Sequence, residues 1–342
     1  MRPRLEIRFS LSRQWAFCFG KPYSPAANEF LLNRARSGIM IALKALDLPL
    51  GSHIGVMAYN CHTVFNAIKQ AGYTPVFLDV TDTLTLDFDD LRKKHTSIQA
   101  LVISHLFGII SDVNSIREEY PDLPIIEDCA HAFGMQSSHG DFCVFSIGQG
   151  KLPSLGDGGI LLVNNENNHK KTASLYDELP SYSPFQCIMQ WGKMVFKSIL
   201  YSPCIYGCIT TPMKRKRKAA SGIETIIPRK MSNGVRSIFE SERSSFPGAI
   251  AQRLENTQKM ESILTRTPGV RNVLSGSING FMAIAYCDNL PLAMSEMRRK
   301  RIETATHFAH CIYWAKEFGY TTGTCPKTEK LISHLLMAPT YK

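Results

Sequence analysis

The segment Phe142-Cys143-Val144-Phe145-Ser146-Ile147-Gly148-Gln149-Gly150-Lys151 begins as an apolar, strand-like run and ends at a lysine among glycines. Gly156-Asp157-Gly158-Gly159 follows a few residues later. Glycine lets a backbone approach another group closely, because it has no β-carbon to keep that group away. An exposed loop lysine is the ordinary alternative, but glycines on both sides of Lys151 indicate that the loop approaches a ligand.

A carboxylate lies upstream of this loop, in Ile125-Ile126-Glu127-Asp128-Cys129-Ala130-His131-Ala132. Asp128 closes a strand-like run, so its side chain is expected at the edge of a sheet. A helix cap is the common alternative for such an aspartate. A lysine that binds an aldehyde covalently and an aspartate that keeps a pyridine nitrogen protonated are what pyridoxal phosphate chemistry requires. Partial burial beside other cations would lower the pKa of the lysine enough to make it nucleophilic.

Residues 28–163 alternate between helical and strand-like segments at short intervals, which predicts a mostly parallel sheet covered on both faces. Ligands of such sheets bind beyond the carboxyl ends of the strands. Tyr59, His105, Asp128 and Ser146 each stand at the end of a different strand. The predicted helices are 30–46, 63–70, one starting near Asp87, and 113–120; the predicted strands are 54–58, 75–79, 100–104, 123–126 and 142–146.

The second half of the chain changes character. Residues 185–206 form an apolar segment interrupted by two lysines; it is either a packing helix or an interfacial helix on a membrane, with the basic run Lys214–Lys218 touching lipid headgroups. Residues 232–264 predict a helix broken or kinked at Pro247. We therefore expect three parts: a large α/β domain (24–180), a helical and basic connecting segment (181–231), and a small α+β domain (232–342) on which 1–23 pack.

Composition and charge restrict the classes of function. The chain of 342 residues carries a formal net charge of +10, and five of those positive charges lie in Lys214–Lys218. Nucleic-acid binding is not expected, since neither interleaved aromatics nor zinc-ligand spacings accompany the basic residues. We expect no metal site.

The cysteine pattern and the hydropathy favour a cytoplasmic protein. The ten cysteines contain no Cys-X-X-Cys pair, and Cys18, Cys61, Cys129 and Cys143 lie in or beside apolar runs, as reduced core thiols do. The uncharged stretch 198–213 contains two prolines and is shorter than the ~20 residues that span a bilayer. We expect neither a secretion signal nor a transmembrane helix.

Together these motifs resemble the DegT/DnrJ/EryC1/StrS sugar aminotransferases, which are fold type I pyridoxal phosphate enzymes. The resemblance implies an α/β fold with a mostly parallel seven-stranded sheet in the large domain. The motifs that carry it are Ser37-Gly38, similar to a phosphate-binding Ser-Gly-Thr; Gly72–Val80, similar to a strand entry; Ser104–Gly108, similar to His-Leu-Tyr-Gly; Glu127–Ala132; and Phe145–Gly159 with its lysine and Gly-Asp-Gly-Gly.

The resemblance also implies roles for single residues. Lys151 would carry the covalent link to the cofactor and then move protons, and Asp128 would pair with the pyridine nitrogen. His131 would lie against the ring. Three residues, Ser37, Gly38 and Ser146, would hold the phosphate. The family's aromatic residue over the ring aligns with Cys61 here, so either Tyr59 or His62 would replace it.

The implied activity is transfer of an amino group, commonly from glutamate, to a keto-sugar linked to a nucleotide, in the synthesis of polysaccharides or modified sugars. The family works as homodimers with the active site at the interface. Sugar dehydratases of this family have histidine in place of the lysine. The presence of Lys151 therefore argues against a dehydratase. The alternative is a cofactor-binding protein with weak or no transaminase activity that acts as a partner, with a weak association with a membrane surface. It is motivated by the absence of the family's sugar-site segment from residues 7–23, by the early end of the chain and by the apolar and basic segment Phe185–Lys218.

Overall fold

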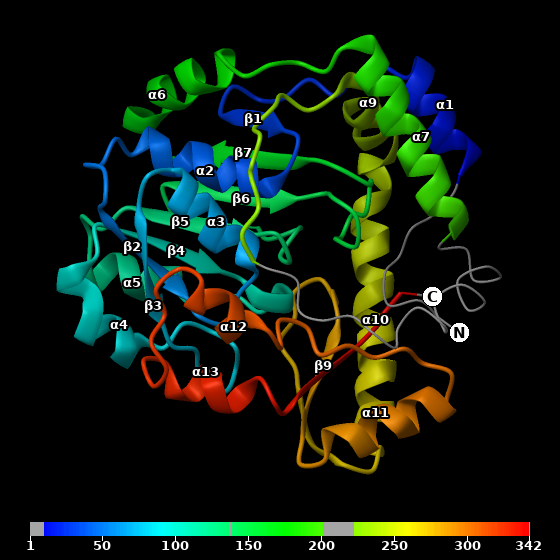
Figure 1. Cartoon of the computed structure of the whole chain (residues 1–342). Helices are drawn as coiled ribbons and strands as arrows, with labels where there is room; N and C mark the ends of the chain where they lie inside the picture. The colour runs from blue at the N-terminus through cyan, green and yellow to red at the C-terminus, as the bar shows by residue number, and fades with distance from the viewer. Residues whose placement is uncertain (1–9, 137, 201–221, 342) are drawn as a thin grey trace.

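Seven strands form the central sheet, in the order β1-β7-β6-β5-β4-β2-β3. The computed structural model describes residues 10–136, 138–200 and 222–341 (Figure 1). The pairs β3/β2, β2/β4, β4/β5 and β5/β6 are parallel, whereas β7 and β1 are added antiparallel. The predicted mostly parallel seven-stranded sheet is therefore confirmed. The strands are β1 (Glu29–Leu32), β2 (His53–Met57), β3 (Thr74–Leu78), β4 (Ala100–Ser104), β5 (Ile125–Cys129), β6 (Phe142–Ser146) and β7 (Gly159–Val163).

Helices cover both faces of this sheet. Every residue of the central strands β4 and β5 is therefore buried. The connecting helices are α2 (Ala35–Ala45), α3 (His62–Gln70), α4 (Phe88–Lys94), η1 (His95–Ser97), η2 (Leu106–Gly108), α5 (Val113–Glu119) and α6 (Glu166–Asp177). A parallel pair needs a crossover that runs back along the sheet. Helices supply it between β2 and β3 and between β4 and β5, whereas no helix of the described residues lies between β5 and β6. As a result, the carboxyl ends of β2, β4, β5 and β6 point to the same edge.

The helix predicted from Phe30 begins later than expected, at Ala35. Phe30 and Leu32 instead belong to β1, where they pair with β7 and are buried. A short, continuously apolar run fits a buried strand and a buried helix equally well, so its periodicity could not distinguish the two.

The C-terminal half of the chain builds a second, three-stranded antiparallel sheet, ordered β10-β9-β8. The break expected at Pro247 is present: α9 ends at Glu242, and the proline lies in the first turn of α10, where a missing N–H leaves no intrahelical bond unmade. The elements are α9 (Asn233–Glu242), η4 (Arg243–Ser245), α10 (Phe246–Thr265), β8 (Val270–Leu274), β9 (Ala283–Cys287), α11 (Leu290–Arg299), α12 (Cys311–Lys316), α13 (Pro326–Leu331) and β10 (Leu335–Ala338).

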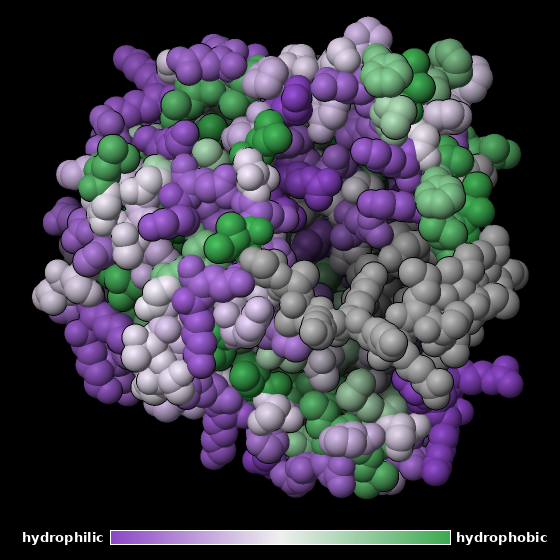
Figure 2. Space-filling view, in the orientation of Figure 1, coloured by the Kyte–Doolittle hydropathy of each residue, from purple (hydrophilic) through white to green (hydrophobic). Residues whose placement is uncertain are grey.

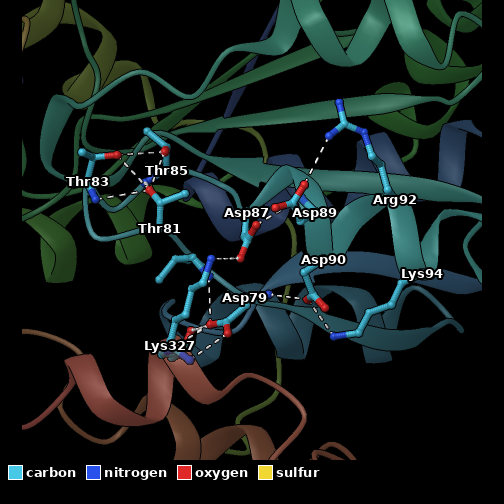
Figure 3. Close-up of polar contacts among 12 residues, drawn as sticks. Asp79, Thr81, Thr83, Thr85, Asp87, Asp89, Asp90, Arg92, Lys94 and Lys327 are labelled. Atoms are coloured by element: carbon cyan, nitrogen blue, oxygen red, sulfur yellow. Dashed lines mark hydrogen bonds and ion pairs between the residues drawn. The ribbon is translucent and has the colours of Figure 1, made fainter.

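The carboxylate of Asp79, just beyond β3, joins the C-terminal half to the central sheet. It accepts hydrogen bonds from the backbone N–H groups of Lys327 and Thr328, at 2.8 and 2.7 Å, and from the Thr328 hydroxyl. The Lys327 ammonium pairs with Asp87 at 2.6 Å (Figure 3). An acidic group at the first turn of α13 is favourable, because unpaired N–H groups and the helix dipole both attract negative charge there.

Two further helices lie beside α9. These are α1 (Leu11–Phe19) and α7 (Pro184–Leu200) (Figure 1). The first contributes Ala16 and Phe17, and the second Met194, to one hydrophobic cluster with Val235 and Ile238 of α9. The predicted helix over residues 185–206 is thus present to Leu200; its remainder and the run Lys214–Lys218 lie outside the described residues. Among the described helices, none is long and apolar enough to cross a membrane.

The cysteines follow the expectation of core thiols only in part. Cys129 and Cys143 are buried on adjacent strands with their sulfur atoms 3.1 Å apart, and Cys61 is half-buried. Cys18 is exposed, which corrects its prediction as a core residue. The reason is that α1 turns Ala16, not Cys18, toward α9.

Candidate active site

A cavity of about 180 Å³ lies at the carboxyl ends of β2, β4, β5 and β6. Each strand supplies residues where it ends, and the first turn of α2 supplies the remaining wall. Four of the residues predicted from the sequence line this cavity: Asp128, His131, Ser146 and Lys151. The other lining residues on which the chemistry depends are Arg34, Arg36, Asn60, Cys61, Ser104, His105, Gly148, Gln149 and Asp157.

Lys151 lies in the loop between β6 and β7, in a tight turn. Its N–H donates to the Gly148 carbonyl at 3.1 Å, and the next glycine, Gly150, has a positive φ of 75° that side chains disfavour. Burial lowers the pKa of the Lys151 amine, and the Arg36 charge lowers it further, whereas Cys61 and Asp128 raise it. No hydrogen bond or ion pair of its Nζ is found within the described residues, so the amine is available to a ligand.

Asp128 is a buried carboxylate on β5. Its Oδ2 accepts the Ser104 hydroxyl at 3.0 Å, and its Oδ1 accepts the Ala130 N–H at 3.1 Å. Asn60 in turn donates to the Ser104 oxygen at 2.8 Å. Burial raises the pKa of the Asp128 carboxyl, while Lys151, Ala130 and Ser104 oppose that rise. A cation placed in the cavity would therefore keep Asp128 ionised.

His131 presents a neutral ring to the cavity. Burial and the nearby charges of Lys151 and His307 hold the pKa of His131 well below its usual value. Its Nδ1 accepts the Phe107 N–H at 3.2 Å, which leaves the proton on Nε2. The ring stacks on Phe281 with centroids 4.4 Å apart and an interplanar angle of 17°. This packing fixes the orientation of the ring.

Behind the cavity, His105 and Glu127 form a buried pair. His105 Nε2 and a Glu127 oxygen are 2.8 Å apart, and the second Glu127 oxygen accepts hydrogen bonds from Ser138, His139 and Gly140. His105 Nδ1 accepts the Ser111 N–H. Although His105, Glu127 and Cys129 come close enough to resemble a metal site, these hydrogen bonds already use the His105 and Glu127 atoms. The pair fixes the ends of β4 and β5.

Four predicted cofactor residues are not among those that line the cavity. The Tyr59 hydroxyl donates to the His307 carbonyl at 2.6 Å, and the His62 ring lies 4.8 Å from Trp314. Ser37 donates to Asn33 at 2.8 Å. A β-carbon on Gly38 would meet Val144 at 2.9 Å, so this glycine lets α2 approach β6 closely.

Two residues of the cavity wall, Cys61 and Arg36, were not predicted as site residues. Cys61 precedes α3 and stands where the family's ring aromatic aligns, which was a usable signal. Arg36 pairs with Glu224 and follows Arg34 at the start of α2. Two arginines at the positive end of a helix need anions nearby, and Asp157 and Glu224 supply them here.

The Cys61 thiol is activated by its neighbours. Burial raises its pKa, but the hydrogen bond and charge of His62, together with the Thr63 hydroxyl that donates to the sulfur at 3.2 Å, outweigh burial and lower the pKa to about 7. At neutral pH a large fraction of Cys61 is therefore thiolate.

Known structures with the same fold come first. The sugar aminotransferase CalS13 from Micromonospora echinospora superimposes with a TM-score of 0.72 at 18% identity, over 99% of this chain and 95% of that one. Spr1654 from Streptococcus pneumoniae, solved in a PMP form, gives a TM-score of 0.73 at 15% identity, over 99% and 94%. At such low identity these matches establish the fold alone, which is that of fold type I aminotransferases.

The family follows from the sequence itself. Residues 23–180 match the model of the DegT/DnrJ/EryC1/StrS aminotransferase family. A GDP-perosamine synthase from Escherichia coli O157:H7 is 32% identical over 136 residues, which are 37% of this chain and 37% of that protein. The aligned part is thus little more than a third of that relative. Over residues 23–180, which are slightly less than half of the chain, the protein is thus similar to the DegT/DnrJ/EryC1/StrS aminotransferase family.

The activated thiol gives a direct test of the cavity. At pH 7 about half of a thiol with a pKa near 7 is ionised, against roughly 3% for an ordinary thiol of pKa about 8.5. We therefore expect iodoacetamide to alkylate Cys61 about fifteenfold faster than an ordinary thiol at pH 7, and the rate to rise with a midpoint near that pH. Peptide mass spectrometry measures the rate at each cysteine.

Cys61→Ser is the control and should lose only the fast-labelled peptide. Added pyridoxal phosphate should slow the labelling, because Cys61 lines the same cavity as Lys151 and Asp128. Fast labelling confined to the exposed Cys18 would contradict the assignment.

Proposed function

We propose that this protein is a pyridoxal phosphate-dependent aminotransferase that transfers an amino group to a keto-sugar. The observation that carries this proposal is that one cavity at the carboxyl ends of the strands holds both the Lys151 amine and the Asp128 carboxylate. The chemistry needs an amine that can lose its proton and an acid that remains ionised. The environment of Lys151 supplies the first condition, because its pKa is lowered, and a cation bound beside the buried Asp128 would supply the second.

The residues present fit the cofactor. Asp128 is buried with only two hydrogen-bond donors, so a protonated pyridine nitrogen would supply the cation that it lacks. Arg34, the N-cap residue of α2, and Arg36, in its first turn, line the cavity and pair with Asp157 and Glu224; a helix N-terminus also favours phosphate. Ser146 can donate a hydroxyl hydrogen bond from the end of β6. Arg34, Arg36 and Ser146 would thus hold the phosphate, and Lys151 and Asp128 would hold the ring.

When bound, pyridoxal phosphate supplies an aldehyde that links to amines and a ring that accepts electrons. The protein's own residues then have separate tasks. Lys151 holds or releases a proton at Nζ, and its lowered pKa leaves more of the amine neutral than in an ordinary lysine. Asp128 keeps the proton on the ring nitrogen. His131, held in the neutral form by burial, packs beside the ring without adding a competing charge.

We further propose glutamate as the amino donor and a nucleotide-linked keto-sugar as the acceptor. Names of similar proteins support this substrate class: GDP-perosamine synthase, and a UDP-N-acetyl-3-dehydro-alpha-D-glucosamine 3-aminotransferase from Acidithiobacillus ferrooxidans that is 30% identical over 148 residues. Both concern sugars attached to nucleotides.

We also propose that two copies of the chain form the working enzyme. An apolar hollow of about 1100 Å³ lies between the start of α10 and the residues that follow β4, lined in part by Phe133, Phe246 and Ile250. It contains neither Lys151 nor Asp128, so its size does not make it the chemical site. A surface of this kind suits burial against a second subunit.

Covalent capture tests the role of Lys151. Borohydride reduction of the protein with pyridoxal phosphate should fix the pyridoxyl group on the peptide that contains Lys151. Lys151→Ala should lose this label and all transamination while it retains the fold, measured by circular dichroism. The exposed Lys44→Ala is the matched control and should keep the label on Lys151. Labelling of another lysine in the unaltered protein would overturn the site.

Absorbance with glutamate separates the aminotransferase from the weakly active alternative. The purified protein with cofactor should be yellow, and glutamate should shift its absorbance as the amino group is taken up. Pooled nucleotide-linked keto-sugars should then restore the original spectrum. A yellow protein that glutamate does not change favours the partner-protein alternative. A protein that takes up no cofactor contradicts both.

A further inference from the structure

Helix α7 carries an apolar stripe on the side that faces away from the molecule. Phe185, Ile188, Met189, Phe196 and Ile199 are between 47% and 70% exposed. Their spacing of three, one, seven and three residues places all five on one face of the helix. Figure 2 shows hydrophobic residues gathered where Figure 1 places α1 and α7. Exposed apolar residues are ordinary singly, but a continuous stripe marks an interaction surface.

The opposite face of α7 is firmly attached, so the stripe does not result from a loosely placed helix. Met194 packs into the hydrophobic cluster shared with α1 and α9. Gln190 donates to Asp157 at 3.1 Å, and Lys197 donates to Gln149 at 2.8 Å. Both acceptors lie in the loop that carries Lys151. The inner side of α7 therefore supports the candidate active site while its outer side is left to solvent.

Helix α1 extends the apolar surface. Its Leu11, Trp15 and Phe19 follow one another at intervals of four residues and are between 68% and 78% exposed. The Trp15 and Phe19 rings contact each other, with centroids 4.7 Å apart. Ala16 and Phe17 of the same helix turn inward to the cluster that also receives Met194. Both helices thus have one buried face and one exposed apolar face.

Charge indicates what covers this surface. Neither α1 nor α7 contains an aspartate or glutamate, and Lys193 lies exposed beside the stripe of α7. A second copy of the chain docking face to face would bring like charges together without an acidic partner on either helix. A lipid surface with anionic headgroups would instead pair with Lys193 while it receives the aromatic and aliphatic side chains.

We propose that the outer faces of α7 and α1 bind the surface of an anionic lipid bilayer. The helices would lie in the plane of the membrane interface. Trp15, Phe185 and Phe196 would insert at the boundary between headgroups and acyl chains, and Lys193 would contact the headgroups. Because α7 is hydrogen-bonded to the Lys151 loop, the bound protein would hold its candidate active site close to the membrane. This binding does not require the cofactor, so it stands apart from the proposed transamination.

Vesicle flotation with the full chain tests the proposal. The protein should float with vesicles of phosphatidylcholine and phosphatidylglycerol and remain behind with phosphatidylcholine alone. Ile188→Gln combined with Phe196→Gln should lower the bound fraction about tenfold or more, since two apolar side chains that would insert into the bilayer are lost. Lys193→Glu should weaken binding to the anionic vesicles. Leu50→Gln, at an 86% exposed leucine outside α1 and α7, is the matched control and should bind normally.

The mass of each variant in solution, measured by sedimentation, tests the alternative that a second copy of the chain, and not a bilayer, covers this surface. Flotation of the Ile188/Phe196 variant equal to that of the parent would overturn the proposal, as would equal binding to neutral and anionic vesicles. Conversion of a dimer to a monomer by the same variant, without vesicle binding by the parent, would assign the surface to a second copy of the chain. Unchanged circular dichroism shows that the variants fold.

Discussion

A carboxylate buried at the end of a parallel strand needs positive charge, and Asp128 is such a group. Its two oxygens receive one hydroxyl and one backbone N–H, which is fewer donors than an isolated buried carboxylate requires to stay ionised. Asn60 orients Ser104, and Ser104 orients Asp128, so the unsatisfied charge points in a fixed direction. Lys151 supplies part of the compensation, and a protonated ring would supply the remainder.

The other features of the cavity follow from this charge. The Lys151 loop must come close to the strand ends, and it does so through glycines: Gly150, Gly156 and Gly158 have positive φ angles that residues with side chains disfavour. Arg36 holds the amine toward its neutral form, whereas Cys61 and Asp128 draw it toward the charged form. The proton on Lys151 is therefore balanced between opposed neighbours, which suits a residue that gives up and regains a proton.

The central sheet was largely predictable from the sequence, because short apolar runs with polar residues at their ends specify both the strands and the edge at which ligands bind. This is why Asp128, His131, Ser146 and Lys151 could be expected together. The exception is Phe30–Leu32, which was predicted as helix and forms a strand, because a buried edge strand and a buried helix have the same short apolar pattern. The pattern could not show that Tyr59 and His62 turn to His307 and Trp314, since those partners lie about 250 residues further along the chain. Side-chain direction at a strand end depends on such distant packing. Distant packing also explains why Ser37 and Gly38 lie away from the cavity wall, and why Cys61 and Arg36 lie on it.

The most direct measurement of the role of Asp128 is the nitrogen-15 chemical shift of ring-labelled pyridoxal phosphate bound to the protein, followed over pH in the parent and in Asp128→Asn. In the parent, the ring nitrogen should remain protonated well above the pH at which the variant loses that proton, because only the parent places a negative charge beside it. The same shift and the same pH dependence in both proteins would contradict the pairing of Asp128 with the ring.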